Sequence, residues 1–375
     1  MFLSLWRGPL RRQLRRPLIA GVILLTLLTA YGPERAYSQA DSRSTDLREP
    51  TLLSESENAY NPIPSPDGKL IAYVKTGFER PGGSGGFGRS NLESWIKLMD
   101  SDGHILTAEP LVDAFLQGWT PDGRNLMCFR DWNACLISLN GTKQHDIRLE
   151  PNGPTKTERA AYLPQLDAIV WGFSSGNTLT IQTSKGELLR QTRDSDLGAN
   201  LAPSPNGRYL ANVGRNLRIY DTQTKSWSDL GSVTIGPDNG AVNSSWSPWF
   251  SNSEQLTFIS ENKVMVSSPD GTLRQTIAAP AERVGYPAAS PNGQWVAFVS
   301  FSPRPRRLRP DLTFWGNSTI WVAAVASEPP VARQLTATAA ESTSGLRWLN
   351  NDEIVFDRLS DSFLGISGRL WKVRR

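Results

Sequence analysis

A short turn motif that returns along the chain is the feature that most constrains the fold. It reads S-P-D-G at residues 65–68, T-P-D-G at 120–123 and S-P-N-G at both 204–207 and 290–293. Proline presets φ, Asp or Asn bonds the neighbouring backbone, and glycine takes a positive-φ corner, so each copy predicts a tight turn. A β-prone run follows each turn, as in Leu70-Ile71-Ala72-Tyr73. The motif therefore predicts a repeated strand-turn-strand unit.

Weaker copies of the motif extend the repeat to seven units. They are centred on Pro164, Pro248 and Leu349. The anchor positions 66, 121, 164, 205, 248, 291 and 349 are separated by steps of 55, 43, 41, 43, 43 and 58 residues. A repeat of about 40–45 residues is the length of a four-stranded propeller blade. We therefore expect an all-β fold, a seven-bladed β-propeller of four-stranded antiparallel blades over residues 50–375.

The seventh unit lacks one strand, and the region before the first turn has one to spare. Strand candidates in the seventh unit are residues 345–349, 353–357 and 369–374. Residues 50–55 read as a strand with no blade of their own. We expect this N-terminal strand to complete the last blade and close the ring, because closure removes exposed sheet edges.

The turn followed by a strand resembles the TolB-like, WD-repeat-like propellers of the bacterial cell envelope. The resemblance covers roughly residues 50–375 and implies the propeller architecture. TolB-like proteins also carry an α/β domain before the propeller, for which the polar stretch 41–49 is too short, so we expect only a linker there. Similar blades occur in binding proteins, in lyases and beside peptidase domains, so the resemblance does not specify a function.

Residues 1–40 have the order of an export signal. An arginine-rich start precedes an apolar run from about residue 17 to 31, and Ser38-Gln39-Ala40 offers a signal-peptidase site. We expect cleavage after Ala40. The alternative is an uncleaved membrane anchor, with the arginines holding the N-terminus in the cytoplasm. Both readings place the rest of the chain outside the cytoplasm, in the periplasm or anchored to the inner membrane and facing the periplasm.

The basic charge of the chain belongs to that segment. Residues 1–40 hold six arginines and one acid, out of 40 basic and 36 acidic residues in the whole chain. The remaining 34 basic and 35 acidic residues nearly balance. A nucleic-acid partner is therefore not indicated.

Catalytic and metal-binding motifs are scarce. The nucleophile-elbow pattern G-x-S-x-G and the phosphate-binding glycine loops are absent. His104 and His145 are the only histidines, and Asp100-Ser101-Asp102-Gly103 fits a plain turn as well as part of a calcium loop. We predict no catalytic residue, no metal site and no cofactor.

The two cysteines, Cys128 and Cys135, flank a predicted hairpin turn at Asp131-Trp132. A two-residue turn places them directly opposite each other, where a disulfide can form in an oxidising compartment. A hydrogen-bonded register would hold their Cα atoms wider apart than the alternative register does. The sequence leaves the bonded and the free state open, with a structural role if bonded.

Three units carry long insertions between their second and third strands. We expect loops at residues 77–91, 302–317 and 358–368, in blades one, six and seven, which become neighbours when the ring closes. The loops combine arginine with aromatic residues, which are enriched in binding hot spots, although long loops are also tolerated without a function. The residues expected to contact a partner are Phe78, Arg80, Phe87, Arg89, Arg304, Arg306, Arg307, Arg309, Trp315, Arg358 and Phe363.

The function predicted from these features is a non-catalytic, extracytoplasmic scaffold that binds a protein or an acidic envelope polymer. The propeller is expected to be monomeric. Two alternatives stay open, namely a propeller enzyme such as a polysaccharide lyase and a sensor ectodomain on a retained membrane anchor. A lyase would place titratable residues around the central channel, and the low histidine content argues against it.

Overall fold

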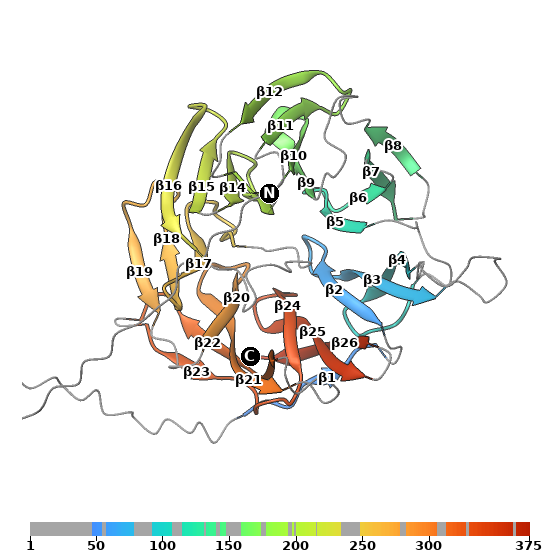
Figure 1. The fold of residues 1–375 in the computed structure, drawn as a ribbon, viewed down its shortest axis with the longest axis vertical. Coiled ribbons are helices and arrows are strands. Elements are labelled where there is room, and N and C mark those ends of the chain that lie inside the picture. The colour runs from blue at the N-terminus through green and yellow to red at the C-terminus, as the bar shows by residue number, and fades with distance from the viewer. Residues whose placement is uncertain are drawn as a thin grey trace, which may run out of the picture. The chain divides into compact units, whose positions relative to one another are not determined.

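Seven antiparallel sheets follow one another in chain order around a ring (Figure 1). The computed structural model describes residues 47–54, 58–78, 92–106, 115–130, 133–139, 143–147, 159–173, 178–193, 197–198, 200–214, 216–233, 248–277, 283–305, 313–327, 330–362 and 365–375. The propeller belongs to one compact unit, residues 43–375. Within the described ranges, no helix has the length and apolar character needed to cross a bilayer. The structure confirms the all-β, seven-bladed fold.

The strands fall into seven blades, named here blade 1 to blade 7 in chain order. Blade 1 contains β2 (Ala59–Pro64), β3 (Leu70–Phe78) and β4 (Leu92–Asp100). Blade 2 contains β5 (Phe115–Trp119), β6 (Asn125–Arg130), β7 (Asn133–Ser138) and β8 (Lys143–Ile147). Blade 3 contains β9 (Arg159–Leu163), β10 (Ala168–Phe173), β11 (Thr178–Thr183) and β12 (Leu188–Arg193). Blade 4 contains β13 (Asn200–Pro203), β14 (Tyr209–Val213), β15 (Asn216–Asp221) and β16 (Ser226–Ser232). Blade 5 contains β17 (Leu256–Ser260), β18 (Lys263–Ser267) and β19 (Arg274–Ile277). Blade 6 contains β20 (Arg283–Ala289), β21 (Trp295–Pro305), β22 (Thr313–Ala324) and β23 (Ala332–Gln334). Blade 7 contains β24 (Ser342–Trp348), β25 (Glu353–Ser362), β26 (Gly365–Arg374) and β1 (Thr51–Leu52).

Blades 1 and 5 have three strands each in the described residues. In blade 5 the first-strand position holds only an isolated bridge between Trp249 and Leu256. In blade 1 a bridge between Met99 and Ile105 begins a partner for β4. The four-stranded prediction therefore holds for the other five sheets, as the structure describes them.

The repeated turn has the geometry that its sequence predicts. In blade 1 the Ser65 hydroxyl donates to Asp67 at 2.6 Å and accepts from the Leu70 N–H at 3.0 Å, so serine and aspartate hold the turn together. Gly68 has φ 70°, and a Cβ there would collide with the Leu349 carbonyl of blade 7. Glycine is thus required at position 68 both by the positive φ angle and by the close contact with the backbone of blade 7.

The weak copy of the turn in blade 3 uses a different backbone. Pro164–Leu166 form a 3-10 turn, η1, which ends in Asp167 at φ 43°. Tyr162 and Ser184 donate hydrogen bonds to the Asp167 carboxylate at 2.7 and 2.8 Å. A side chain that can bond locally tolerates the left-handed region, so Asp167 takes the place of the glycine at the end of the S/T-P-D/N-G copies.

Closure of the ring follows the prediction. The short strand β1 pairs with β26, with Thr51 opposite Lys372 and Leu52 opposite Trp371. Leu53 is then buried in a cluster that joins blade 1 to blade 7, which includes Tyr73 and Leu370. The first described strand of the chain therefore supplies the outer strand of the last blade.

The core is a series of apolar layers between neighbouring blades. One cluster joins residues of blades 6 and 7, and another joins residues of blades 4 and 5. Each blade is thus covered on its faces by its neighbours, which explains the nearly continuous burial along strands such as β11 and β17.

Candidate interaction surface

The hairpins between the second and third strands differ in length around the ring. Strands β3 and β4 have 9 residues each, β21 and β22 have 11 and 12, and β25 and β26 have 10 each. The corresponding strands of blades 2 to 5 have 5 or 6. Every second strand begins soon after the repeated turn, so the additional residues extend the far end of the hairpin. At about 3.3 Å per residue, the three hairpins project roughly 10 Å or more beyond the others.

These three hairpins belong to consecutive blades. Trp348 of blade 7 donates to the Ala288 carbonyl of blade 6 at 3.0 Å, and the Asn61 N–H of blade 1 donates to Asp357 of blade 7 at 3.0 Å. Blade 7 therefore lies between blades 6 and 1. Connections between second and third strands all emerge on one face of a propeller. We call the group β3–β4, β21–β22 and β25–β26 the hairpin sector.

Two segments predicted to be loops are largely strand. In blade 6, β21 continues to Pro305 and β22 begins at Thr313, with Pro303 opposite Trp315. Strand β20 pairs with β21 only as far as Phe301. Beyond that residue one edge of β21 has no strand partner, so the N–H groups that Pro303 and Pro305 lack are not needed for hydrogen bonds on that edge. In blade 7, β25 and β26 pair up to residues 362 and 365. The loop prediction for 302–317 and 358–368 was therefore wrong for most of both segments.

The structure describes only part of the predicted contact set. Arg358 lies in β25, and its side-chain contacts are given below. Phe78, Arg304 and Trp315 lie at strand positions in β3, β21 and β22. The other predicted contact residues lie outside the described residues, namely Arg80, Phe87, Arg89, Arg306, Arg307, Arg309 and Phe363.

Arg358 is half-buried against aromatic rings. Its guanidinium carbon lies 4.9 Å from the ring centre of Trp371 and 5.4 Å from that of Phe356. Burial lowers the pKa of Arg358, while the negative charges of Glu341 and Glu49 act in the opposite direction. Its Nε atom is buried without a hydrogen-bond partner. This arginine is held by packing rather than by an ion pair.

Beneath Arg358, a buried carboxylate joins blades 7 and 1. Asp357 accepts hydrogen bonds from the Ser344 hydroxyl at 2.7 Å and from the Asn61 N–H at 3.0 Å. Burial raises the pKa of Asp357, against the effect of these donors and of Arg347. Gly345 has φ 58°, and a Cβ there would lie 2.9 Å from Asp357 Oδ1. The cluster fixes the base of the β25–β26 hairpin against the neighbouring blade.

A tryptophan directly before the turn connects three pairs of blades; in blade 5 the turn is Phe250–Ser253, with Ser253 at φ 63°, so the sequence anchor Pro248 lies two residues ahead of it. Trp119, Trp249 and Trp348 donate from Nε1 to the carbonyls of Ile63, Ala202 and Ala288 at 2.8, 2.8 and 3.0 Å. Each acceptor precedes the turn of the previous blade by the same number of residues. Our sequence reasoning missed this contact, although the repeated Trp before the turn is a visible signal for it.

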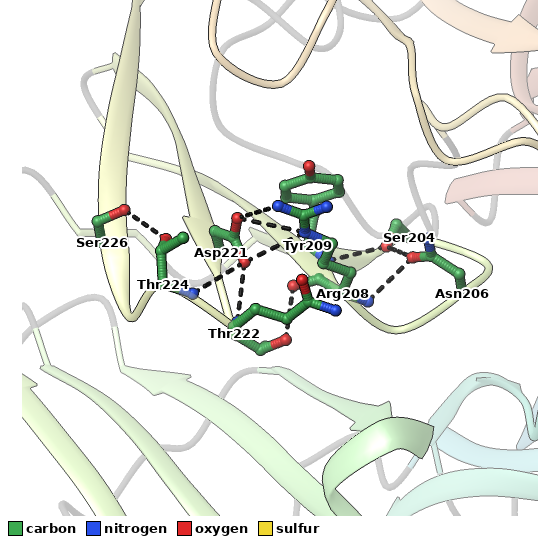
Figure 2. A network of polar contacts seen from close by, with 9 residues as sticks. Ser204, Asn206, Arg208, Tyr209, Asp221, Thr222, Thr224 and Ser226 are labelled. Atoms are coloured by element: carbon green, nitrogen blue, oxygen red, sulfur yellow. Dashed lines mark hydrogen bonds and ion pairs between the residues drawn. The ribbon is translucent and has the colours of Figure 1, made fainter.

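Blade 4 carries a polar network at the opposite end of its strands (Figure 2). Arg208 Nη2 lies 2.8 Å from Asp221 Oδ2, and the guanidinium stacks over Tyr209 at 4.8 Å. Burial raises the pKa of Asp221, but the Arg208 bond and two backbone N–H donors outweigh it, so that pKa lies below its ordinary value. Here the positive charge of Arg208 is balanced by the Asp221 carboxylate. The network joins the turn before β14 to the turn after β15.

Other candidate sites have structural explanations. Cys128 lies directly opposite Cys135 in the β6–β7 hairpin, with Cα atoms 5.0 Å apart, and a disulfide joins them. The Asp100 carboxylate accepts from the N–H groups of Asp102 and His104 at 2.9 Å and lies 2.8 Å from His104 Nδ1, which makes the segment a closed turn. In the part of the chain that the structure describes, no three His, Cys, Asp or Glu residues gather as a metal site.

Comparison with known proteins supports the fold. No protein-family model matches the chain, and no curated protein sequence matches it. Among solved structures, the β-propeller domain of Cps50 (Swd1) from Myceliophteria thermophila is similar, with a TM-score of 0.56 and 11% sequence identity. The match covers 86% of this chain and 99% of that domain. A likeness at this identity establishes a WD-repeat-like propeller fold alone, and the bacterial TolB-like assignment stays a prediction.

Proposed function

We propose that this chain is a non-catalytic, exported propeller that binds another protein through the hairpin sector. The observation that carries the proposal is the projection of three consecutive hairpins beyond an otherwise uniform ring. Blades 2 to 5 close their cores with second and third strands of 5 or 6 residues, so the additional length is not needed for folding. WD-repeat-like propellers generally mediate protein interactions, which supports the same reading.

Paired hairpins suit a binding surface better than free loops do. A strand that is already hydrogen-bonded loses little conformational freedom when a partner docks. Blades 6 and 7 provide such strands up to Pro305 and Ser362. Binding residues are commonly presented on projections from a rigid scaffold, and the remaining ring supplies that scaffold.

The proposed location rests on residues 1–40. We propose that the segment directs export to the periplasm and is removed after Ala40. The intact mass of the exported protein distinguishes the two readings of the sequence. A mature chain beginning at Asp41 supports cleavage, whereas retention of Met1 together with membrane association after alkaline washing replaces it with the anchor.

Partner capture tests the binding proposal. Arg304, Arg306, Arg307 and Arg309 are replaced together by serine, and a control variant replaces four exposed cations of blades 3 to 5, namely Lys185, Arg193, Lys225 and Lys263. Each variant is used to capture proteins from a native envelope extract, and captured proteins are then purified and titrated directly. Loss of a partner by the first variant but not by the control supports the proposal. Equal capture by both places the binding surface elsewhere.

An activity assay addresses the enzymatic alternative. The wild-type protein is incubated with a panel of acidic polysaccharides, and double-bond formation is followed by ultraviolet absorbance. Turnover would replace the non-catalytic proposal with a lyase.

A further inference from the structure

The disulfide of blade 2 lies inside the interface between blades 1 and 2. Cys128 and Cys135 occupy opposite positions of β6 and β7, and their exposed fractions are 0% and 3%. They belong to one apolar cluster with four residues of blade 1, namely Ile63, Ala72, Ile96 and Leu98. The adjacent residues of the same strands, Met127 and Ala134, pack toward blade 3. Both faces of the hairpin are therefore covered once blades 1, 2 and 3 have assembled.

A disulfide forms by exchange, and exchange needs accessible sulfur atoms. A cysteine thiolate of the chain attacks one sulfur of an oxidant's disulfide and expels the other sulfur as a thiolate. The second cysteine then attacks the sulfur of the first, which forms the Cys128–Cys135 bond and releases the oxidant's remaining sulfur. Two electrons pass to the oxidant, and its two sulfurs take up the two protons of the cysteine thiols. The packed interface between blades 1 and 2 keeps an oxidant away from both cysteines.

Folding before oxidation would bury both thiols in reduced form. Free cysteine packs as a small apolar side chain, so the reduced hairpin fits the same cluster. In an unfolded chain, by contrast, the two cysteines are 7 positions apart and can meet without any other part of the ring. Closing a loop of about ten residues takes roughly 10–100 ns. Ring closure joins residues 51–52 to residues 371–372 and must wait for the whole chain.

We propose that an oxidant carrying a disulfide makes the Cys128–Cys135 bond before blades 1 and 2 pack, and that the chain is therefore exported unfolded; this inference rests on the proposed export. Disulfides form in oxidising compartments and are rare in the cytoplasm, where thiols are kept reduced. Export of the folded chain would deliver buried thiols that the oxidant cannot reach. The burial of this disulfide thus connects the order of folding with the state in which the chain crosses the membrane.

Rates of thiol loss test the order of events. Reduced folded protein and reduced protein in urea are mixed with oxidised glutathione, remaining thiols are alkylated and counted by mass, and each rate is divided by that of free cysteine in the same buffer. The folded protein should react about 100-fold or more slowly, because its thiols become accessible only through local opening.

An exposed thiol provides the matched control. Gln223→Cys in a Cys128→Ser, Cys135→Ser background places it in the turn between β15 and β16, where Gln223 is exposed. Its normalised rates in the folded and unfolded states should agree within about three-fold. Equal normalised rates for folded and unfolded wild type would overturn the inference, because the bond could then form after folding. Reduced wild type that does not fold would support it, since oxidation must then come first.

Export itself tests the state of the transported chain. Residues 41–375 are exported from a bacterial host behind their own residues 1–40, or behind a leader of the class that transports folded proteins, and thiols are alkylated at lysis. The first periplasmic product should contain no free thiol, whereas the second should retain both. Free thiols in the first product, or a complete bond in the second, would overturn the inference. Retention in the cytoplasm with residues 1–40 attached would overturn the proposed export and the unfolded delivery with it, while the glutathione rates would still decide whether oxidation precedes folding.

Discussion

Blades 2 to 5 and blades 6, 7 and 1 are built on the same plan and differ beyond the core. Both groups have the repeated turn, and the tryptophan donors connect blades in both, at Trp249 as at Trp348. They differ in hairpin length and in the state of their arginines. Arg208 of blade 4 is ion-paired with Asp221, whereas Arg358 of blade 7 stacks on aromatic rings. The repeat thus accounts for folding, and the departures from it mark the surface that we propose for recognition.

Blade 7 also differs from the others in how it is assembled. Its strands come from both ends of the propeller sequence, because β1 pairs with β26. Lys372 reinforces this joint by donating to the Ser101 carbonyl of blade 1 at 2.8 Å. Ring closure therefore depends on blade 7.

The largest expected effect comes from removing the closing strand. Deletion of residues 50–56 should lower the free energy of unfolding by about 3–5 kcal/mol, since it removes buried Leu53 and exposes the edge of β26. Urea denaturation and light scattering measure the loss and the expected aggregation. Leu52→Ser serves as control, because Leu52 is 36% exposed and its loss should cost less than about 0.5 kcal/mol. An unchanged urea midpoint in the deletion variant would show that closure by β1 is not needed.

The turns and spacing predicted the ring because they are local and repeated. Seven blades and closure by the N-terminal strand follow from motifs that recur at fixed steps, and the weak anchors at Pro164 and Leu349 proved to be real turns. The hairpins of blades 6 and 7 were predicted as loops because the additional residues between their expected second and third strands were interpreted as insertions. Pairing on one side of β21 tolerated them.

Contacts between distant residues were the part that sequence could not supply. Asp357 and Asn61 are 296 positions apart, and nothing in the local sequence of either indicates the other. The prediction of Arg358 as a binding residue came from loop composition, whereas its stacking on Trp371 depends on the strand register. Burial without an ion pair is a property of the assembled blade.

A covalent bond in blade 2 gives the next largest expected effect. The double variant Cys128→Ser, Cys135→Ser should lose about 2–3 kcal/mol of stability under oxidising conditions. The disulfide closes a short loop in the unfolded chain as well, which lowers the conformational entropy of the unfolded state and so the entropy lost on folding. Urea denaturation with and without reductant measures it. Reduced wild-type protein should match the double variant. An equal urea midpoint for oxidised wild type and the variant would mean that the bond does not stabilise this hairpin.

The tryptophan donors should contribute equally in both regions. Trp249→Phe and Trp348→Phe should each cost about 1–3 kcal/mol, because each leaves a buried carbonyl without its donor. Thermal and urea denaturation of the two variants provide the comparison. Trp227→Phe is a control, since Trp227 is half-buried beside Tyr220. A large effect in one blade pair only would show that the repeat does not stabilise the two regions alike.

The smallest effect, and the most specific to blade 7, concerns the charge of Asp357. Its pKa in the folded protein is raised by burial above the ordinary value of 3.8. A raised pKa means that the stabilising contribution of the protonated carboxyl is complete below the unfolded pKa and is lost as pH rises through the folded pKa. Asp357→Asn can retain both contacts, with its amide oxygen accepting from the Asn61 N–H and its NH₂ group donating to Ser344.

The variant and the wild type should therefore be equally stable in acid, and the variant should become the more stable one as pH rises. Urea midpoints measured from pH 4 to pH 8 give the difference directly. Asp357→Ala leaves the Asn61 N–H without an acceptor and should cost about 1–3 kcal/mol throughout this range. A constant loss of stability in Asp357→Asn at every pH would instead mean that the ionised carboxylate is the favoured form, with Arg347 and the two donors outweighing its burial.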